Sequence, residues 1–139
     1  MEKIYENLIY SPDDVITFTD GVPGFESNKT FVVVRNESYA PFEWLVCVDG
    51  GMKLRFAMLN PMLVYPEYAP NISKAQVEGL NLHDAQDILM YVFVTVAENP
   101  SDSTVNLMAP VLINTKDKVG RQIILDNSPY STREPIVRQ

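Results

Sequence analysis

The chain contains little of what disulfide and metal chemistry require. Its 139 residues include one cysteine, Cys47, and one histidine, His83. A single cysteine cannot form an intrachain disulfide, and in the apolar run Phe42–Val48 we expect its thiol to pack as a small hydrophobic group. A zinc site needs more His or Cys ligands than His83, Asp84 and Asp87 supply, so we expect no metal.

A long hydrophobic run and an excess of positive charge are also missing. The longest apolar stretch, Ile88–Ala97, has about half the length of a membrane-spanning helix. The first residues lack the basic flank and apolar core of a signal peptide, so we expect a cytoplasmic protein that does not enter a membrane. The chain has 11 Lys and Arg against 18 Asp and Glu, a net charge of −7. This balance argues against direct nucleic-acid binding and is suited to a basic protein partner. The alternative is that the acidic surface only keeps the protein in solution.

No arrangement of residues typical of catalysis is present. A Ser-His-Asp triad would have to use His83, but the chain has no Gly-x-Ser-x-Gly motif. The segment Gly21–Gly24 lacks the lysine of a phosphate-binding loop. The pair Asp13–Asp14 is more typical of a turn than of a glycosidase. We therefore expect no enzyme activity, and keep an enzymatic or small-ligand-binding barrel as an alternative.

Short β-branched or alternating segments separated by turn residues predict a mainly β fold. The expected strands are Ile4–Tyr10, Val15–Phe18, Phe31–Arg35, Phe42–Val48, Leu54–Leu59, Ile88–Ala97, Val105–Asn114 and Val119–Asp126. Ile88–Ala97 is apolar on both faces, which predicts a central strand. Connections too short for crossover helices predict mostly antiparallel pairing. Because closure removes exposed edges, we expect one domain, residues 1–139, forming a closed or nearly closed β-barrel of about seven to nine strands.

Two local features refine this prediction. One short helix is expected from Ser73, because Ser73 and Gln76 have the spacing of a capping box. Gly79 suits the left-handed position that ends such a helix, which would be about two turns long and dependent on packing. Asp49–Gly51 predicts a tight hairpin between two of the strands.

The remaining candidates for function are surface residues. Acidic residues gather in and around the irregular middle of the chain, near a tyrosine, and aromatic residues ringed by charge are typical of protein interfaces. The candidate partner-binding residues are Glu67, Tyr68, Glu78, Asp84, Asp87, Glu98 and Asp102. The alternative is a solvated loop face whose tyrosines fold inward.

Three stretches, in order over nearly the whole chain, resemble the flagellar assembly factor FliW family. They are Ile16–Glu26, which contains Gly-Val-Pro-Gly-Phe-Glu after an Ile-Thr-Phe strand, Phe42–Leu45 up to Asn60–Pro61, and Thr104–Asn114 continuing through Gly120–Leu125 to Tyr130 and Arg133. The chain departs from the family pattern at Thr19, where proline is frequent, and at Asn60–Pro61, where Asp-Pro is usual. Both departures preserve the chemistry of a turn.

The resemblance implies a small β-barrel without a cofactor and with two protein partners. One is flagellin, bound in the cytoplasm before export. The other is CsrA, an RNA-binding dimer that represses translation, and the resemblance implies that binding relieves its repression of flagellin translation. Each partner would then reduce the pool of factor available to the other. An alternative is a flagellin-specific chaperone without CsrA antagonism.

Overall fold

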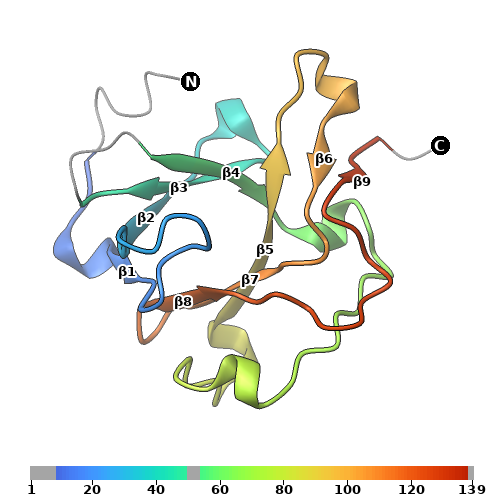
Figure 1. Ribbon diagram of the computed structural model, residues 1–139. Helices are drawn as coiled ribbons and strands as arrows, with labels where there is room; N and C mark the ends of the chain where they lie inside the picture. Colours follow the sequence, from blue (N-terminus) through green and yellow to red (C-terminus); the bar gives the residue numbers. More distant parts are fainter. Residues whose placement is uncertain (1–8, 50–53, 138–139) are drawn as a thin grey trace.

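The structure is a computed structural model that describes residues 9–49 and 54–137. Its strands are β1 (Ile16–Thr17), β2 (Thr30–Val34), β3 (Glu43–Cys47), β4 (Arg55–Leu59), β5 (Ile88–Thr95), β6 (Thr104–Val105), β7 (Val111–Asn114), β8 (Val119–Gln122) and β9 (Glu134–Pro135) (Figure 1). Its 3-10 turns are η2 (Pro12–Asp14), η3 (Glu37–Tyr39), η4 (Pro61–Leu63), η5 (Ala75–Val77), η6 (Ala85–Asp87) and η7 (Pro100–Asp102). No helix in these two ranges has the length and apolar character needed to cross a membrane.

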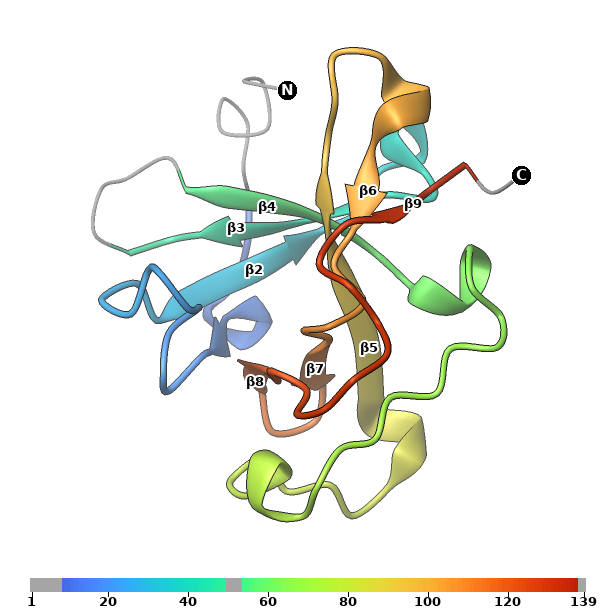
Figure 2. The same cartoon turned by 45° about the vertical axis from the view of Figure 1, so that its right-hand side comes forward.

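The strands form a closed barrel with a short extension. The ring has the order β4-β3-β2-β1-β8-β7-β5, and pairing of β5 with β4 closes it. Neighbours in the ring are antiparallel except β1 and β8, which are parallel. β6 and β9 extend the sheet beside the upper half of β5 (Figure 2). The prediction of a mainly β, mostly antiparallel closed barrel is confirmed.

Alternate residues of the strands fill the barrel interior. In β3, Leu45 and Cys47 belong to the interior core, whereas Trp44 and Val46 pack in a second cluster on the outer face. All four side chains are buried, so the strand has two buried faces. β5 contributes Tyr91 to the interior and pairs with β4, β6 and β7, which confirms the predicted central strand.

One mouth of the barrel is closed by the glycine-rich loop between β1 and β2. Gly21 and Gly24 have φ angles of +68° and +90°, which glycine adopts without a steric penalty. The loop places Val22 in the interior core at 2% exposure and the ring of Phe25 5.5 Å from the ring of Phe56. Side chains from this irregular loop therefore fill this end of the barrel.

The predicted single strand Val105–Asn114 is wrong, because the structure has two short strands, β6 and β7, with a bend between them. At the bend, the side-chain oxygen of Asn106 accepts a hydrogen bond from Met108 N at 3.1 Å, and Pro110 has no N–H for a ladder. The bend allows one stretch of chain to pair with both ends of β5. The predicted strand Val119–Asp126 is shorter too, and corresponds to β8.

The expected helix from Ser73 is a single 3-10 turn, η5. The capping contacts are present: Gln76 N donates to Ser73 Oγ at 3.3 Å, and Ser73 N donates to Gln76 Oε1 at 3.0 Å. Gly79 has a φ of +89°, as expected for the residue that ends the segment. Arg121 Nη1 donates to the carbonyls of Gln76 and Glu78 at 2.9 and 2.7 Å. Arg121 therefore satisfies two carbonyls at the end of this segment, which is shorter than the expected two turns.

Two further predictions lie largely outside the described residues. The strand Ile4–Tyr10 is described only at its last two residues, which are not in a strand. The turn expected at Asp49–Gly51 is described only at Asp49. The two strands that it joins do pair as antiparallel neighbours, with Val46 opposite Arg55.

Candidate functional site

The second mouth of the barrel is hollow and bears charged residues. It lies where β2, β4 and β7 end and where β1, β3, β5 and β8 begin. One hollow of about 480 Å³ is lined by interior residues that include Val33, Leu89 and Ile113, and by Lys118. A second hollow, of about 360 Å³, lies beside β5. Arg35 and Leu89 line both hollows, and we call this end of the molecule the Arg35 mouth.

A network of three side chains crosses the Arg35 mouth. Arg35 Nε lies 2.5 Å from Glu43 Oε1, and Arg35 Nη2 donates to the Tyr91 hydroxyl at 3.1 Å. The Tyr91 hydroxyl donates to the same Glu43 oxygen at 2.7 Å. Burial, together with this hydrogen bond, raises the pKa of Tyr91 to about 12, so the hydroxyl remains a donor. The Arg35 side chain is 60% exposed, so its guanidinium is both held in place and accessible to a partner.

Exposed apolar side chains flank this network. The side-chain oxygen of Asn60 caps η4 by accepting from Met62 N at 2.9 Å. The turn presents Met62 and Leu63 at 41% and 61% exposure. A third hollow, of about 390 Å³, is lined by Leu63, Arg35 and Pro41 among others. Arginine and methionine are enriched in protein interfaces, so this arrangement is suited to binding another protein.

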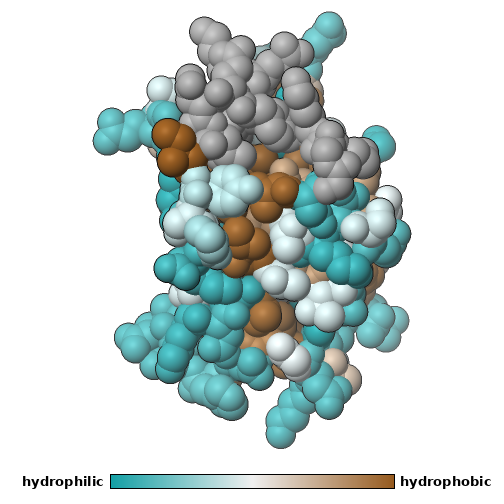
Figure 3. Space-filling view, turned by 90° about the vertical axis from the view of Figure 1, so that its left-hand side faces the viewer, coloured by the Kyte–Doolittle hydropathy of each residue, from teal (hydrophilic) through white to brown (hydrophobic). Residues whose placement is uncertain are grey.

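Exposed apolar residues in other regions of the described surface are scattered. Phe25, Ile124 and Val96 have exposures of 37%, 49% and 56%, and they lie on the glycine-rich loop, after β8 and after β5. On the face shown in Figure 3, apolar residues form a narrow strip between hydrophilic ones. Scattered exposed hydrophobic residues are common on proteins. Two other hollows, of about 330 and 510 Å³, lie beside η5, and the larger is lined by the ion pair Arg121–Asp20. The Arg35 mouth differs in that three hollows share Arg35, a residue of the charged network.

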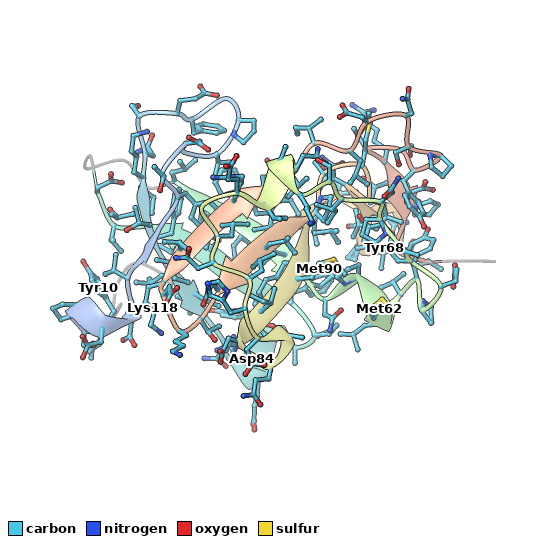
Figure 4. All side chains as sticks on the ribbon, turned by 90° about the horizontal axis from the view of Figure 1, so that it is seen from below. Tyr10, Met62, Tyr68, Asp84, Met90 and Lys118 are labelled. Atoms are coloured by element: carbon cyan, nitrogen blue, oxygen red, sulfur yellow. The ribbon has the colours of Figure 1, made fainter. Side chains whose placement is uncertain are left out.

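The acidic residues predicted as one partner-binding group lie at both ends of β5. Asp84 and Asp87 precede this strand, which begins at the Arg35 mouth, and in Figure 4 Asp84 lies near the lower edge, with Met62 apart from it to the right. Glu98 and Asp102 follow β5, whose 8 residues span about 26 Å. Figure 1 shows the turns at the two ends of β5 well apart. The structure therefore separates this group into two regions.

The other three predicted residues differ in exposure. Glu67 and Glu78 are exposed, on the irregular segments after η4 and after η5. Tyr68 is 4% exposed, its hydroxyl donates to Leu107 O at 2.6 Å, and its ring packs edge to face against Tyr130 at 4.7 Å. Burial raises the pKa of Tyr68 well above its ordinary value. Tyr68 is therefore a core residue and cannot be the exposed aromatic anchor that the sequence predicted.

The sequence analysis did not identify Arg35 and Glu43 as functional candidates. Both continue the run of inward-facing positions in their strands, Arg35 after Val33 and Glu43 before Leu45. A charged group at an inward position is unfavourable unless it is paired. The signal that could have found them is therefore the placement of opposite charges on the interior faces of two neighbouring strands.

Metal or thiol chemistry has little basis in the described residues. No three His, Cys, Asp or Glu side chains within 9–49 and 54–137 lie together in a way that could hold a metal ion. Cys47 is 4% exposed, and its Sγ donates to Asp49 Oδ1 at 2.7 Å. Burial raises the pKa of the Cys47 thiol, which reduces the fraction of reactive thiolate. The thiol packs in the interior core, as expected.

Comparison with known proteins identifies the family. The family model described as FliW protein matches residues 1–136. The chain belongs to the FliW family. The flagellar assembly factor FliW of Alkaliphilus metalliredigens is 38% identical to it over 99% of this chain and 85% of the relative. For the flagellar assembly factor FliW of Thermoanaerobacter pseudethanolicus the identity is 36%, over 99% of this chain and 91% of the relative.

A solved FliW structure has the same fold. The crystal structure of the flagellar assembly factor FliW matches with a TM-score of 0.88 and 32% sequence identity, over 95% of this chain and 92% of that chain. The resemblance to the FliW family that was read from three stretches of sequence is therefore confirmed. The Arg35 mouth is therefore one end of a barrel that belongs to the FliW family.

Proposed function

We propose that this FliW-family chain acts in flagellar assembly by binding two proteins in the cytoplasm. One is flagellin before its export. The other is CsrA, and the binding relieves CsrA repression of flagellin translation. Membership of a family of flagellar assembly factors supports the role in assembly. The Arg35 mouth is the structural observation that supports a mechanism based on protein binding.

The Arg35 mouth suits a protein partner better than a small substrate. Leu63 and Met62 project beside the hollows, and burying such a side chain against a partner contributes about 1.5–3 kcal/mol. Arg35 adds donors that can bind a carbonyl or a carboxylate. His83, the base that a Ser-His-Asp enzyme would use, lines none of the three hollows. No specific observation therefore favours an enzymatic or small-ligand-binding barrel.

The charge of the chain favours a partner with a basic surface. The net charge is −7. Asp84 and Asp87 form no ion pair with a cation of the described residues. Exposed carboxylates of this kind speed encounter with a basic protein and help to orient it. If both partners bind this mouth, each displaces the other, which couples flagellin level to CsrA activity.

Titration of the purified chain with CsrA, with and without flagellin, tests the proposal. We expect a complex with each partner and loss of the CsrA complex as flagellin is added. Leu63→Asp should weaken binding by about tenfold or more, because it removes an exposed apolar contact and adds an unpaired charge. Val96→Asp is the matched control: it lies beyond the far end of β5 with a similar exposure of 56%, and we expect it to bind as the unmodified chain does.

The possible results separate the hypotheses. Complexes with flagellin but not with CsrA would support a flagellin-specific chaperone instead. The absence of both complexes would refute the proposed function. Equal losses in the Leu63→Asp and Val96→Asp variants would remove the Arg35 mouth from the interface.

A further inference from the structure

The barrel closes unevenly along β5. β4 pairs with only part of this strand, and its last partners are Leu59 and Val92. β5 continues from there towards the Arg35 mouth as far as Ile88, and pairs with β7 on its other side. On the β4 side, no strand of the described chain pairs with β5 between Ile88 and Tyr91. This part of β5 is an open sheet edge within an otherwise closed barrel.

The backbone of Met90 faces this open edge. Asp87 O accepts from Thr115 N at 2.8 Å, and Phe93 O accepts from Asn106 N at 3.0 Å. The carbonyls of the odd-numbered residues of this stretch therefore point to the side of β5 on which β7 and β6 lie. Because backbone hydrogen-bonding groups alternate between the two edges of a strand, the N–H and C=O of Met90 point in the opposite direction.

The open edge has its cause in the dipeptide Asn60–Pro61. If β4 continued in register, Pro61 would stand opposite Met90, but proline has no N–H to donate. Instead the chain turns away into η4, where Pro61 O accepts from Val64 N and Tyr65 N at 3.1 and 2.8 Å. Within the described part of the chain, no residue hydrogen-bonds to the Met90 backbone from this side.

The second hollow of the Arg35 mouth runs along this edge. Its lining includes Ile88–Tyr91, which are consecutive residues of β5. Successive side chains of a strand point to opposite faces, so a space that touches all of them lies beside the strand. Met62 also lines this space, as do Arg35 and Glu43, and Figure 4 shows Met62 next to Met90 in the view from below. The volume of about 360 Å³ has room for a short stretch of extended chain.

We propose that an extended, basic segment of a partner protein pairs with this edge of β5 and adds a strand to the barrel. The proposal rests on the proposed function, in which a protein binds at the Arg35 mouth. Met90 offers one donor and one acceptor to the added strand, as in other cases of strand addition. Asp84 and Asp87 precede Ile88 and lack a cationic partner within the described ranges. They are placed to bind a Lys or Arg side chain at one end of the segment.

Amide hydrogen exchange of the chain, alone and with purified CsrA or flagellin, tests this binding mode. In the free chain we expect the Met90 amide to exchange fast and the amides of Leu89 and Tyr91 to exchange slowly, because only the latter two face β7. On binding, Met90 exchange should slow by at least about tenfold, with little change at Leu89 and Tyr91. A partner that only covered this surface would not slow exchange at Met90 while leaving its neighbours Leu89 and Tyr91 unchanged.

A charge variant tests whether the bound segment carries a basic side chain near Asp84. Asp84→Asn removes the charge, while the new amide oxygen can still accept from Gln86 N as Asp84 Oδ1 does at 3.1 Å. We expect affinity to fall by about two- to fivefold, the size of one exposed charge pair. Asp102→Asn is the matched control at the opposite end of β5, and its affinity should not change.

The outcomes separate this inference from the proposed function. Slow exchange of Met90 in the free chain would show that the edge is already paired and would overturn the inference. Binding of either partner without slower exchange at Met90 would also overturn it, and would leave the proposed function intact. Failure of both partners to bind would contradict the proposed function itself.

Discussion

The network at the Arg35 mouth predicts a specific effect of replacing Tyr91 by phenylalanine. The change removes the hydroxyl that donates to Glu43 Oε1 at 2.7 Å and accepts from Arg35 Nη2 at 3.1 Å. A hydrogen bond to a charged group contributes about 1.5–3 kcal/mol. The Glu43 side chain is 21% exposed and that of Arg35 60%, so water replaces part of what is lost. We therefore expect Tyr91→Phe to lower the free energy of unfolding by about 1.5 kcal/mol at pH 8.

The same replacement predicts how stability depends on pH. Burial and the hydrogen bond to Glu43 raise the pKa of Tyr91 from 10.0 to about 12, so folding favours the protonated hydroxyl. This contribution is complete below pH 10, the ordinary tyrosine value, and is lost as pH rises through 12. At about pH 11 the unmodified chain should have lost about 1.4 kcal/mol of it. The phenylalanine variant has no such group, so the difference between the two proteins should nearly vanish there.

Urea unfolding at pH 8 and pH 11 measures both effects. Trp44 is the one tryptophan of the chain and is 6% exposed, so its fluorescence reports unfolding. Other tyrosines titrate in both proteins, and their effect cancels in the difference between the unfolding free energies. A difference that is the same at both pH values would refute the reasoning, and equal stability at pH 8 would show that the hydrogen bonds contribute nothing.

Two further predictions concern the barrel interior. A Cβ on Gly120 would lie 2.7 Å from two ring atoms of Phe18, so Gly120→Ala should lower the free energy of unfolding by about 1–3 kcal/mol; an unchanged urea midpoint would contradict this close contact. Cys47 is buried with a raised pKa, so iodoacetamide at pH 8 should modify the native chain about 100-fold more slowly than the urea-unfolded chain. Mass spectrometry gives both rates, and similar values would show that the thiol is accessible.

The sequence predicted the parts of the fold that follow from local pattern. The pattern of Phe42–Val48 gave the strand β3, and the apolar, β-branched run Ile88–Ala97 gave the central strand β5. The spacing of Ser73 and Gln76 gave a real pair of reciprocal hydrogen bonds. These predictions succeeded because alternation and capping depend on residues that are near one another in the chain.

The predictions that failed depend on partners far away in the sequence. Val105–Asn114 bends at Asn106 and Pro110, and its two halves pair with opposite ends of β5, a pairing that the strand pattern alone does not report. The turn after Ser73 is bound at its end by Arg121, a residue of the distant strand β8 that donates to the carbonyls of Gln76 and Glu78. The candidate acidic residues were grouped by their proximity in sequence, and an extended strand then separated Asp87 from Glu98.

Predicting the Arg35 mouth would have required knowing how the strands close into a barrel. Arg35 and Glu43 look like ordinary charges at strand ends in the sequence, and only closure of the ring by β5 brings Tyr91 against this pair. The two mouths of the closed barrel also differ in what fills them. A loop that can place apolar side chains inside the barrel fills the first mouth, whereas the second has a polar network that leaves space behind it.

The dipeptide Asn60–Pro61 links this architecture to binding. Its proline stands two positions after Leu59, the last residue of β4 that pairs with β5, and its asparagine caps the turn that carries Met62 and Leu63 to the surface. One local feature therefore both opens the edge of β5 and places apolar side chains beside it. In a closed barrel, where few backbone groups are free to bind a partner, the place where the ladder stops is also the place where the chain can extend its sheet into another protein.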